Sequence, residues 1–306
     1  MEIIDNYGRI EGRTSVALGI FDGVHLGHRS VIGAAVKRGE EQGVKPAVFT
    51  FKTSTVTTKG RLDALLTDDD KLTQFGRLGV ESICCADFAE LKELTPAEFV
   101  RDILADRMNA VSVVCGENFH FGRGGIAGAG ELTRLCSERG IEVVTVPPLK
   151  IGGERVSTTR IRELIRSGGI ATANALLGYR YTYRLEVVHG AELARTWEFP
   201  TINQVIPERL IKPRFGVYCV KVRIDGGEYA GVCNVGTKPT VGKQSPPLAE
   251  TFIIGYSGNA YGKTAEVEFC EFVRSEMKFG SFGELRAEIA RNTEFTKKYF
   301  GLEQKS

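Results

Sequence analysis

Residues 19–29 read Gly19-Ile20-Phe21-Asp22-Gly23-Val24-His25-Leu26-Gly27-His28-Arg29, a junction rich in glycine and histidine. The apolar run at 14–18 is typical of a buried strand, and the apolar residues between 30 and 42 recur at helical spacing. Glycine lets the backbone turn sharply and come close to a ligand. Because the first amides of a helix favour an anion, this junction predicts a strand-to-helix turn that binds phosphate.

The two histidines of this junction, His25 and His28, are half of the four in the chain. An imidazole can donate a hydrogen bond to a phosphate oxygen and can stabilise charge on a phosphorus centre. Two other interpretations stay open: surface histidines in a loop that needed glycines, and metal ligands. Metal binding is not supported by a third histidine beside these two or by a cysteine pair at the spacing of zinc ligands.

The composition is that of an ordinary globular protein. With 306 residues, of which 42% are hydrophobic and 25% charged, the chain is long enough for two domains. A net charge of +2 argues against a nucleic-acid binder held by a basic surface. The seven cysteines include no CxxC pair, which favours reduced thiols. Neither a signal sequence nor a membrane-length apolar run occurs, so we expect a cytoplasmic protein that binds no membrane.

Strand-like and helical runs alternate from residue 14 to about 147. We expect strands at 14–18, 44–51, 82–88, 111–115 and 141–146, and helices at 30–42, 68–78, 95–108 and 130–139. This alternation predicts an α/β domain with a parallel sheet, whose ligands bind beyond the carboxyl ends of the strands. The junction at 19–29 lies at one of these ends.

Two further segments of the N-terminal half combine glycines or hydroxyls with charge. Residues 116–125 follow the strand that ends at Cys115, so we expect them at the same sheet edge as the histidines; a plain flexible loop is the alternative. Residues 156–162 read Val-Ser-Thr-Thr-Arg-Ile-Arg and open a predicted helix, where amides, hydroxyls and a guanidinium can bind phosphate. An ordinary helix cap with solvated arginines is the alternative there.

The pattern changes after Gly168, Gly169 and a short predicted helix at 171–177. Strand-like runs now follow one another without helices between them, at 183–188, 217–224, 229–235, 251–254 and 265–273, before a last helix at 282–300. This order predicts a small antiparallel β-barrel with a C-terminal helix. We place the two domains at 1–178 and 179–306.

Within the second half, Thr201 and Asn203 lie two residues apart on a predicted extended segment, Phe199-Pro200-Thr201-Ile202-Asn203. Two such side chains point the same way and can bind a hard cation or a phosphate oxygen. Glu250 follows two prolines, and we expect it to open a strand at the rim of the barrel. Further motifs follow at 216–218, 234–240, 261–263 and 274–279.

The stretch FDGVHLGH at 21–28 resembles the HxGH signature of nucleotidylyltransferases, and all these motifs together resemble the bifunctional riboflavin kinase/FMN adenylyltransferase family over nearly the whole chain. The resemblance implies a Rossmann-like nucleotidylyltransferase domain followed by a riboflavin kinase barrel. The barrel would phosphorylate riboflavin with ATP to give FMN. The first domain would then transfer the AMP part of a second ATP to FMN, giving FAD and pyrophosphate, with Mg²⁺ in both steps.

The resemblance also implies roles for individual residues. The catalytic residues would be His25, His28 and Arg160 in adenylyl transfer and Glu250 as the base for the riboflavin 5′-hydroxyl. Thr201 and Asn203 would hold Mg²⁺ and ATP phosphates, with Arg274 also binding nucleotide or flavin. The remaining nucleotide contacts of the first domain would be Gly19, Phe21, Asp22, Gly23, Gly27, Asn118, Ser157 and Thr158.

The chain departs from the family pattern at two places. After Phe51 it lacks the usual TF-(D/E)-PHP segment, and Ala194 and Glu198 replace glycines in a loop that approaches ATP phosphates. Two alternatives therefore stay open besides the bifunctional enzyme. One is an FMN adenylyltransferase with an impaired kinase half, and the other is a regulator that binds flavin or nucleotide without turnover.

Overall fold

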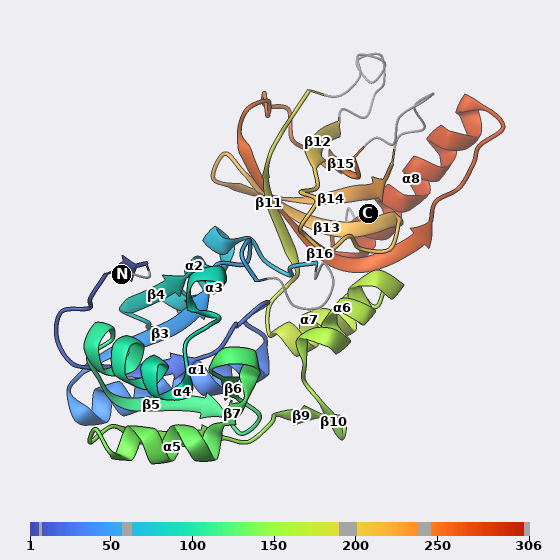
Figure 1. Ribbon diagram of the computed structural model, residues 1–306. Coiled ribbons are helices and arrows are strands. Elements are labelled where there is room, and N and C mark those ends of the chain that lie inside the picture. The colour runs from blue at the N-terminus through green and yellow to red at the C-terminus, as the bar shows by residue number, and fades with distance from the viewer. Residues whose placement is uncertain (6–7, 57–62, 190–200, 238–245, 303–306) are drawn as a thin grey trace. The chain divides into compact units, whose positions relative to one another are not determined.

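The computed structural model describes residues 1–5, 8–56, 63–189, 201–237 and 246–302 (Figure 1). The chain divides into two compact units, Met1–Thr158 and Thr159–Ser306. Ala194 and Glu198 lie outside the described residues, and so does the loop expected to approach ATP. None of the described helices combines the length and the apolar character needed to cross a membrane.

The first unit is built on a six-stranded sheet in the order β1-β4-β3-β2-β5-β8, and all its neighbouring strands are parallel. The strands are β1 (Glu2–Ile4), β2 (Thr14–Leu18), β3 (Lys45–Phe51), β4 (Ser82–Ala86), β5 (Ala110–Gly116) and β8 (Glu142–Val146). The parallel α/β sheet is as predicted. Among these strands only β1 was not predicted, because three residues are too few to show a pattern.

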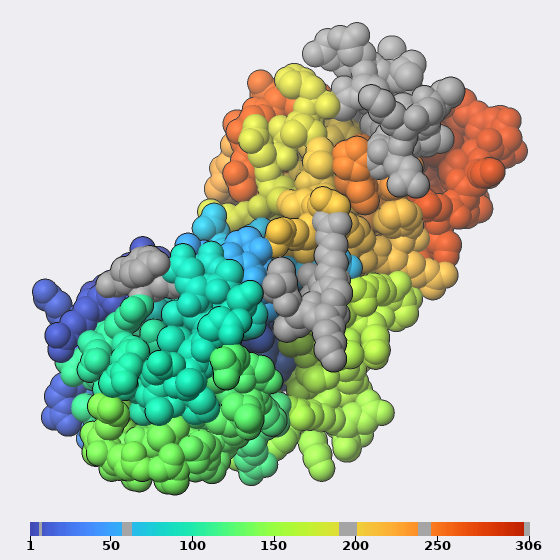
Figure 2. Space-filling model, viewed as in Figure 1, coloured from blue at the N-terminus to red at the C-terminus, as the bar shows by residue number. Residues whose placement is uncertain are grey.

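Helices cover both faces of this sheet. The helix α1 (Leu26–Gln42) contacts β2, β3 and β5 through buried Val31, Ile32 and Ala35. The opposite face packs in a core with a helical segment Phe99–Arg107 and with α5 (Ala129–Ser137). Figure 2 shows the first unit from the side on which the teal-to-green segment, including α5, covers it. The other helices of the unit are α2 (Asp68–Arg77), α3 (Phe88–Leu91) and α4 (Pro96–Glu98).

The predicted helix at 95–108 begins as expected and then changes type. Thr95 and Glu98 form a capping box with Pro96 in the first turn. From Phe99 to Arg107 the backbone is a π-helix. Among the smaller elements are β6 (His120–Phe121), which pairs with β7 (Ala127–Gly128), and an exposed hairpin of β9 (Lys150–Ile151) and β10 (Glu154–Arg155).

The strand order reverses direction at β2. β2 pairs with β3 on one side and with β5 on the other, so the chain leaves β2 in one direction and later returns to its other flank. The carboxyl ends of such strands form the ligand-binding switch point of an α/β sheet. The segments that follow β2 and β5 are those containing His25 and Asn118.

The second unit contains a six-stranded antiparallel sheet in the order β11-β16-β13-β14-β15-β12. A bridge between Val188 and Asn203 brings the two edges of this sheet together, so the barrel is nearly closed. This is the predicted small barrel. Its strands are β11 (Thr182–Glu186), β12 (Thr201–Val205), β13 (Gly216–Ile224), β14 (Gly227–Gly236), β15 (Leu248–Ile253) and β16 (Thr264–Ser275).

The helices described in the second unit are α6 (Thr158–Ser167), α7 (Ile170–Leu177) and the C-terminal α8 (Phe282–Tyr299). α8 packs on β13 and β14, as expected for the last helix. The side chain of Asn174 on α7 donates to the carbonyl of Phe269 and accepts from the amide of Tyr181, at 2.8 and 2.7 Å. These bonds group α7 with the barrel in packing, while the functional boundary at 178 stays a prediction.

Candidate active sites

The turn between β2 and α1 is tightly constrained. Phe21 and Val24 adopt positive φ angles of 52° and 36°, which a β-branched residue such as valine rarely does. A Cβ on Gly23 would lie 2.5 Å from Leu65, and one on Gly19 would lie 2.7 Å from the Phe21 ring. Backbone strain of this kind is often found at binding sites, where surrounding contacts hold it in place.

Asp22 is one source of that constraint. Its carboxylate accepts a hydrogen bond from the amide of Leu65 at 2.9 Å, and its backbone carbonyl accepts one from Oγ1 of Thr158 at 3.4 Å. Thr50 of the neighbouring strand donates to the carbonyl of Ile20 at 2.8 Å. Asp22 therefore organises the turn, and its expected contact with nucleotide stays a prediction.

His25 and His28 lie against each other at the start of α1. Nδ1 of His25 accepts a hydrogen bond from the amide of His28 at 3.2 Å, so His25 is the N-cap of the helix. The two rings stack with centroids 3.5 Å apart and planes inclined by 17°. Since Nδ1 of His25 is an acceptor, the proton of the neutral ring is on Nε2, which is the nitrogen left for a ligand.

Burial keeps both imidazoles uncharged near neutral pH. It lowers the pKa of His25 from 6.5 to about 4, and the nearby charge of Arg155 adds to this effect. Burial also lowers the pKa of His28 well below its usual value, and the neighbouring His25 contributes. Nδ1 of His28 is buried and has no hydrogen-bond partner among the described residues. The pair therefore presents neutral hydrogen-bond donors rather than fixed positive charge.

The two segments expected beside the histidines are placed as follows. Asn118 is exposed in the turn after β5, where the amide of Phe119 donates to the carbonyl of Gly116 at 2.9 Å. This turn follows the strand next to β2, at the same edge of the sheet. The segment of Val156, Ser157 and Thr158 also reaches the histidine turn: a Cβ on Gly27 would lie 3.7 Å from the carbonyl oxygen of Val156. Arg160 lies in the second compact unit, so its position opposite the histidines stays a prediction.

The segment after β3, where the family pattern is missing, is held by a buried lysine. Lys71 is only 1% exposed, and its ammonium donates to the carbonyl of Phe51 at 2.5 Å and lies 3.7 Å from the carboxylate of Asp68. Asp68 also accepts from the amide of Thr53 at 2.7 Å. Lys71 was not among the predicted site residues, because a lysine in a helix is normally solvated.

On the barrel, the strand register brings three polar residues into one row. Asn203 of β12 pairs directly with Glu250 of β15, which pairs on its other side with Asn234 of β14. Directly opposite residues share a face of the sheet and have Cβ atoms about 5 Å apart. Thr201 lies two residues before Asn203 on the same face. Oδ1 of Asn203 is buried without a hydrogen-bond partner among the described residues.

One expectation about this row was wrong. Glu250 does not open its strand, because β15 begins at Leu248, which already pairs with Val205 and Gly236. Glu250 therefore lies inside the row instead of at its end. Asn234 is a member that the sequence analysis noted only as part of a motif, since its proximity to Glu250 depends on the pairing of strands.

Arg274 continues the row on the far side. It pairs with Val217 of β13, which in turn pairs with Asn234. Its Nε lies 3.0 Å from the carboxylate of Glu288 on α8, and its guanidinium lies 5.8 Å from the centre of the Phe279 ring. The charge of Arg274 is thus partly balanced by the helix, and its expected nucleotide or flavin contact stays a prediction.

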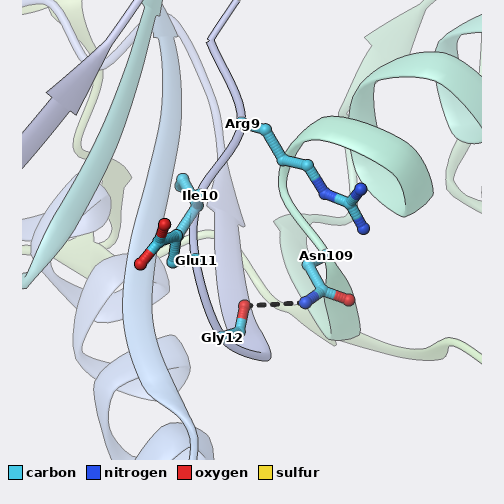
Figure 3. A pocket seen from close by; sticks show the side chains of 5 residues that line it. All are labelled: Arg9, Ile10, Glu11, Gly12 and Asn109. Atoms are coloured by element: carbon cyan, nitrogen blue, oxygen red, sulfur yellow. Dashed lines mark hydrogen bonds between the residues drawn. The ribbon is translucent and has the colours of Figure 1, made fainter.

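A pocket of about 410 Å³ lies elsewhere and contains none of these residues (Figure 3). It is lined by Arg9, Ile10, Glu11, Gly12 and Asn109. Gly12 and Asn109 precede β2 and β5, so the pocket lies at the amino ends of these strands, opposite the histidines. In the described ranges, no three or more His, Cys, Asp or Glu side chains form a metal-binding group.

Comparison with known proteins decides the family. One family model, FAD synthetase, matches residues 9–160, and a second, riboflavin kinase, matches residues 177–300. A bifunctional riboflavin kinase/FMN adenylyltransferase of Listeria monocytogenes is 33% identical over 93% of this chain and 92% of its own length. Proteins of the same description from Bacillus subtilis and Escherichia coli are 32% and 31% identical, over 95% and 94% of this chain and 93% of each relative.

The chain belongs to the bifunctional riboflavin kinase/FMN adenylyltransferase family. The predicted family, the fold class and the two enzyme activities are therefore confirmed. A crystal structure of a Streptococcus pneumoniae protein, described as a macrolide-efflux protein, is 29% identical and matches with a TM-score of 0.85 over 97% of this chain and 99% of that one. This chain and that structure therefore share one fold over nearly their whole length.

Proposed function

We propose that this family member performs its two reactions at the two places just described, adenylyl transfer at the switch point of the sheet and riboflavin phosphorylation along the Asn203–Glu250–Asn234 row. The observation that supports the kinase site most strongly is the pairing of Asn203 with Glu250, and the one that supports the adenylyl site is the stacking of His25 on His28. The proposal assigns adenylyl transfer to residues 1–178 and the kinase to 179–306.

In adenylyl transfer, a phosphate oxygen of FMN attacks the α-phosphorus of ATP. A new P–O bond forms, the bond to the bridging oxygen breaks, and pyrophosphate leaves with the electron pair. Nε2–H of each neutral histidine donates to phosphate oxygens that gain charge, while Ser157, Thr158 and Arg160 hold the rest of the triphosphate. The glycines at 19, 23 and 27 let the turn pack closely, because a Cβ there would meet Phe21, Leu65 or His25. No covalent enzyme intermediate is needed, because orientation and charge stabilisation suffice.

In the kinase reaction, Glu250 accepts the proton of the riboflavin 5′-hydroxyl as its oxygen attacks the γ-phosphorus of ATP. Oxygen donors such as those of Thr201 and Asn203 are the ligand type that Mg²⁺ prefers, and Oδ1 of Asn203, which has no hydrogen-bond partner among the described residues, fits such a role. When bound, Mg²⁺ would neutralise phosphate charge. Asn203 and Thr201 would hold it, and Asn234 lies where it can orient Glu250.

The wider setting follows from the same proposal. The substrates and products are riboflavin, FMN, FAD and ATP, with no nucleic acid or membrane partner. All seven cysteines are free and buried, which supports a reducing compartment such as the cytoplasm.

Product analysis tests the proposal. Purified protein incubated with riboflavin, ATP and Mg²⁺ should give FMN first and FAD later, with pyrophosphate released as FAD forms. FAD from added FMN but not from riboflavin would favour an impaired kinase, and a Glu198→Gly variant should then restore phosphorylation. Flavin binding with no pyrophosphate from either starting flavin would favour the regulator and reject the proposal.

A further inference from the structure

The buried face of α2 is largely polar. Lys71, Gln74 and Phe75 are the buried residues of this helix, and their spacing of three and four positions puts them on one side of it. A face that served packing alone would be apolar, because burying an ammonium or an amide costs free energy unless it is hydrogen-bonded. Lys71 donates to the carbonyl of Phe51 at the end of β3. The contacts of Gln74 and Phe75 lead instead to the turn that follows β2.

Gln74 reaches this turn through Arg29. Nη2 of Arg29 donates to Oε1 of Gln74 at 2.8 Å, and Nε of the same guanidinium donates to the carbonyl of Val24 at 3.1 Å. A guanidinium is planar and its donors have fixed directions, so an acceptor on one side orients the donor on the other. Val24, with its positive φ angle, directly precedes His25. The bond from Gln74 therefore helps to fix the backbone where it enters the cap of α1.

Phe75 contacts the same turn from the next position of α2. Its ring meets that of Phe21 edge to face with centroids 5.9 Å apart, and Phe21 meets the ring of His28 in the same way at 5.4 Å. Both phenylalanines are buried. Consecutive residues of α2 thus support the turn at two points, one next to each histidine. Such support matters for hydrogen-bond donors to a developing charge, because a displacement of about 1 Å can lower a rate about a hundredfold.

We propose that Gln74 is a positioning residue for adenylyl transfer: it holds Arg29 against the carbonyl of Val24 and thereby orients the ring of His25 toward the α-phosphate of ATP. Gln74 acts on the turn and not on a substrate, and it lies in none of the motifs that indicate the two activities. Because the histidines stabilise charge that develops in the transition state, loss of Gln74 lowers the maximal rate more than it weakens substrate binding. The inference rests on the proposed function of the histidine turn.

Steady-state kinetics of FAD formation from FMN test this role. Gln74→Met removes the acceptor but keeps the shape of the side chain, so kcat should fall about tenfold with little change in KM for FMN or ATP. Gln74→Glu offers a carboxylate to the same guanidinium and should recover most of the loss. Thr73→Met places the same side chain at the exposed neighbouring position of α2 and should change neither kcat nor KM.

A loss of stability alone would not give this pattern, because protein that is folded at the assay temperature would keep its kcat. Thermal unfolding shows whether each variant is folded there. If Gln74→Met is not, Arg29→Lys takes its place, since lysine keeps the charge but has a single nitrogen instead of the fork, and it should give the same loss of kcat.

A double variant shows whether Gln74 acts through Arg29. Arg29→Met alone should lower kcat, and adding Gln74→Met should lower it no further, whereas independent effects multiply. If the unaltered protein adenylylates FMN and Gln74→Met keeps its kcat, or if the two losses multiply, the role of Gln74 is rejected alone. If the unaltered protein does not adenylylate FMN, the proposed site is rejected with it.

Discussion

His25 caps the helix on which His28 lies, and the two rings stack 3.5 Å apart. The cap uses Nδ1 of His25 as an acceptor, so the proton of the neutral ring is on Nε2. Burial favours the neutral form of both rings. The pair can therefore donate to phosphate oxygens over a wide pH range without first binding a proton.

The first prediction concerns acid. Burial lowers the pKa of His25 from 6.5 to about 4, so between these values the unfolded chain binds a proton that the folded chain does not. The free energy of unfolding should then decrease by about 2 kcal/mol from pH 7 to pH 5 on account of this group. Urea unfolding at the two pH values measures the change. His25→Asn keeps a helix cap but does not titrate, so its pH dependence should be smaller; an equal dependence would contradict the assignment.

The second prediction uses two glycines of one helix. A Cβ on Gly27 would lie 3.2 Å from Cε1 of His25, whereas one on Gly33 would meet nothing within 4 Å. Gly27→Ala should therefore displace the His25 ring and lower adenylyl transfer at least tenfold. Gly33→Ala should leave activity unchanged and raise stability by up to about 1 kcal/mol, because alanine favours helix. FAD formation from FMN measures the activity, and thermal unfolding measures the stability. Equal activities of the two variants would be evidence against the site.

The third prediction concerns Lys71. Lys71→Met removes a buried charge but leaves the carbonyl of Phe51 without its donor, so stability should fall by about 1–3 kcal/mol. Lys37→Met, at a position 77% exposed, should leave stability unchanged. Denaturant unfolding compares them. If Lys71→Met leaves the free energy of unfolding unchanged, the segment after β3 is held by other contacts.

The fourth prediction concerns the metal. Asn203→Ala removes Oδ1, which has no hydrogen-bond partner within the described ranges, so the Mg²⁺ concentration for half-maximal riboflavin phosphorylation should rise about tenfold. Asn203→Asp keeps an oxygen at this position, so its Mg²⁺ concentration for half-maximal phosphorylation should be lower than that of Asn203→Ala. Excess chelator should stop phosphorylation in all forms. If Asn203→Ala lowers the maximal rate with no change in Mg²⁺ dependence, Asn203 does not hold the metal.

Local patterns were enough to predict the histidine turn and its place at a strand end. Alternating strands and helices give the parallel sheet, and Thr95 with Pro96 marks a helix start that the structure confirms. The long helix at 282–300 was equally clear, since its pattern extends over five turns.

Features that depend on strand pairing or packing could not be predicted from local sequence patterns. Glu250 and Asn203 are 47 positions apart, and only the register of β12 with β15 makes them neighbours. The stacking of His25 on His28 depends on a helix cap formed through a ring nitrogen. The sequence around Lys71 predicts a solvated side chain, since its contact with the carbonyl of Phe51 at the end of β3 exists only in the folded structure.

The most direct test of two separate sites is a cross comparison of two variants in one assay. With riboflavin, ATP and Mg²⁺, His25→Gln/His28→Gln should accumulate FMN with FAD formation reduced at least a hundredfold. Glu250→Gln should make almost no FMN from riboflavin yet convert added FMN to FAD at the rate of the unaltered protein. If either variant loses both reactions while its fold is intact, the two reactions do not have separate sites. If neither variant loses a reaction, the assigned residues are wrong.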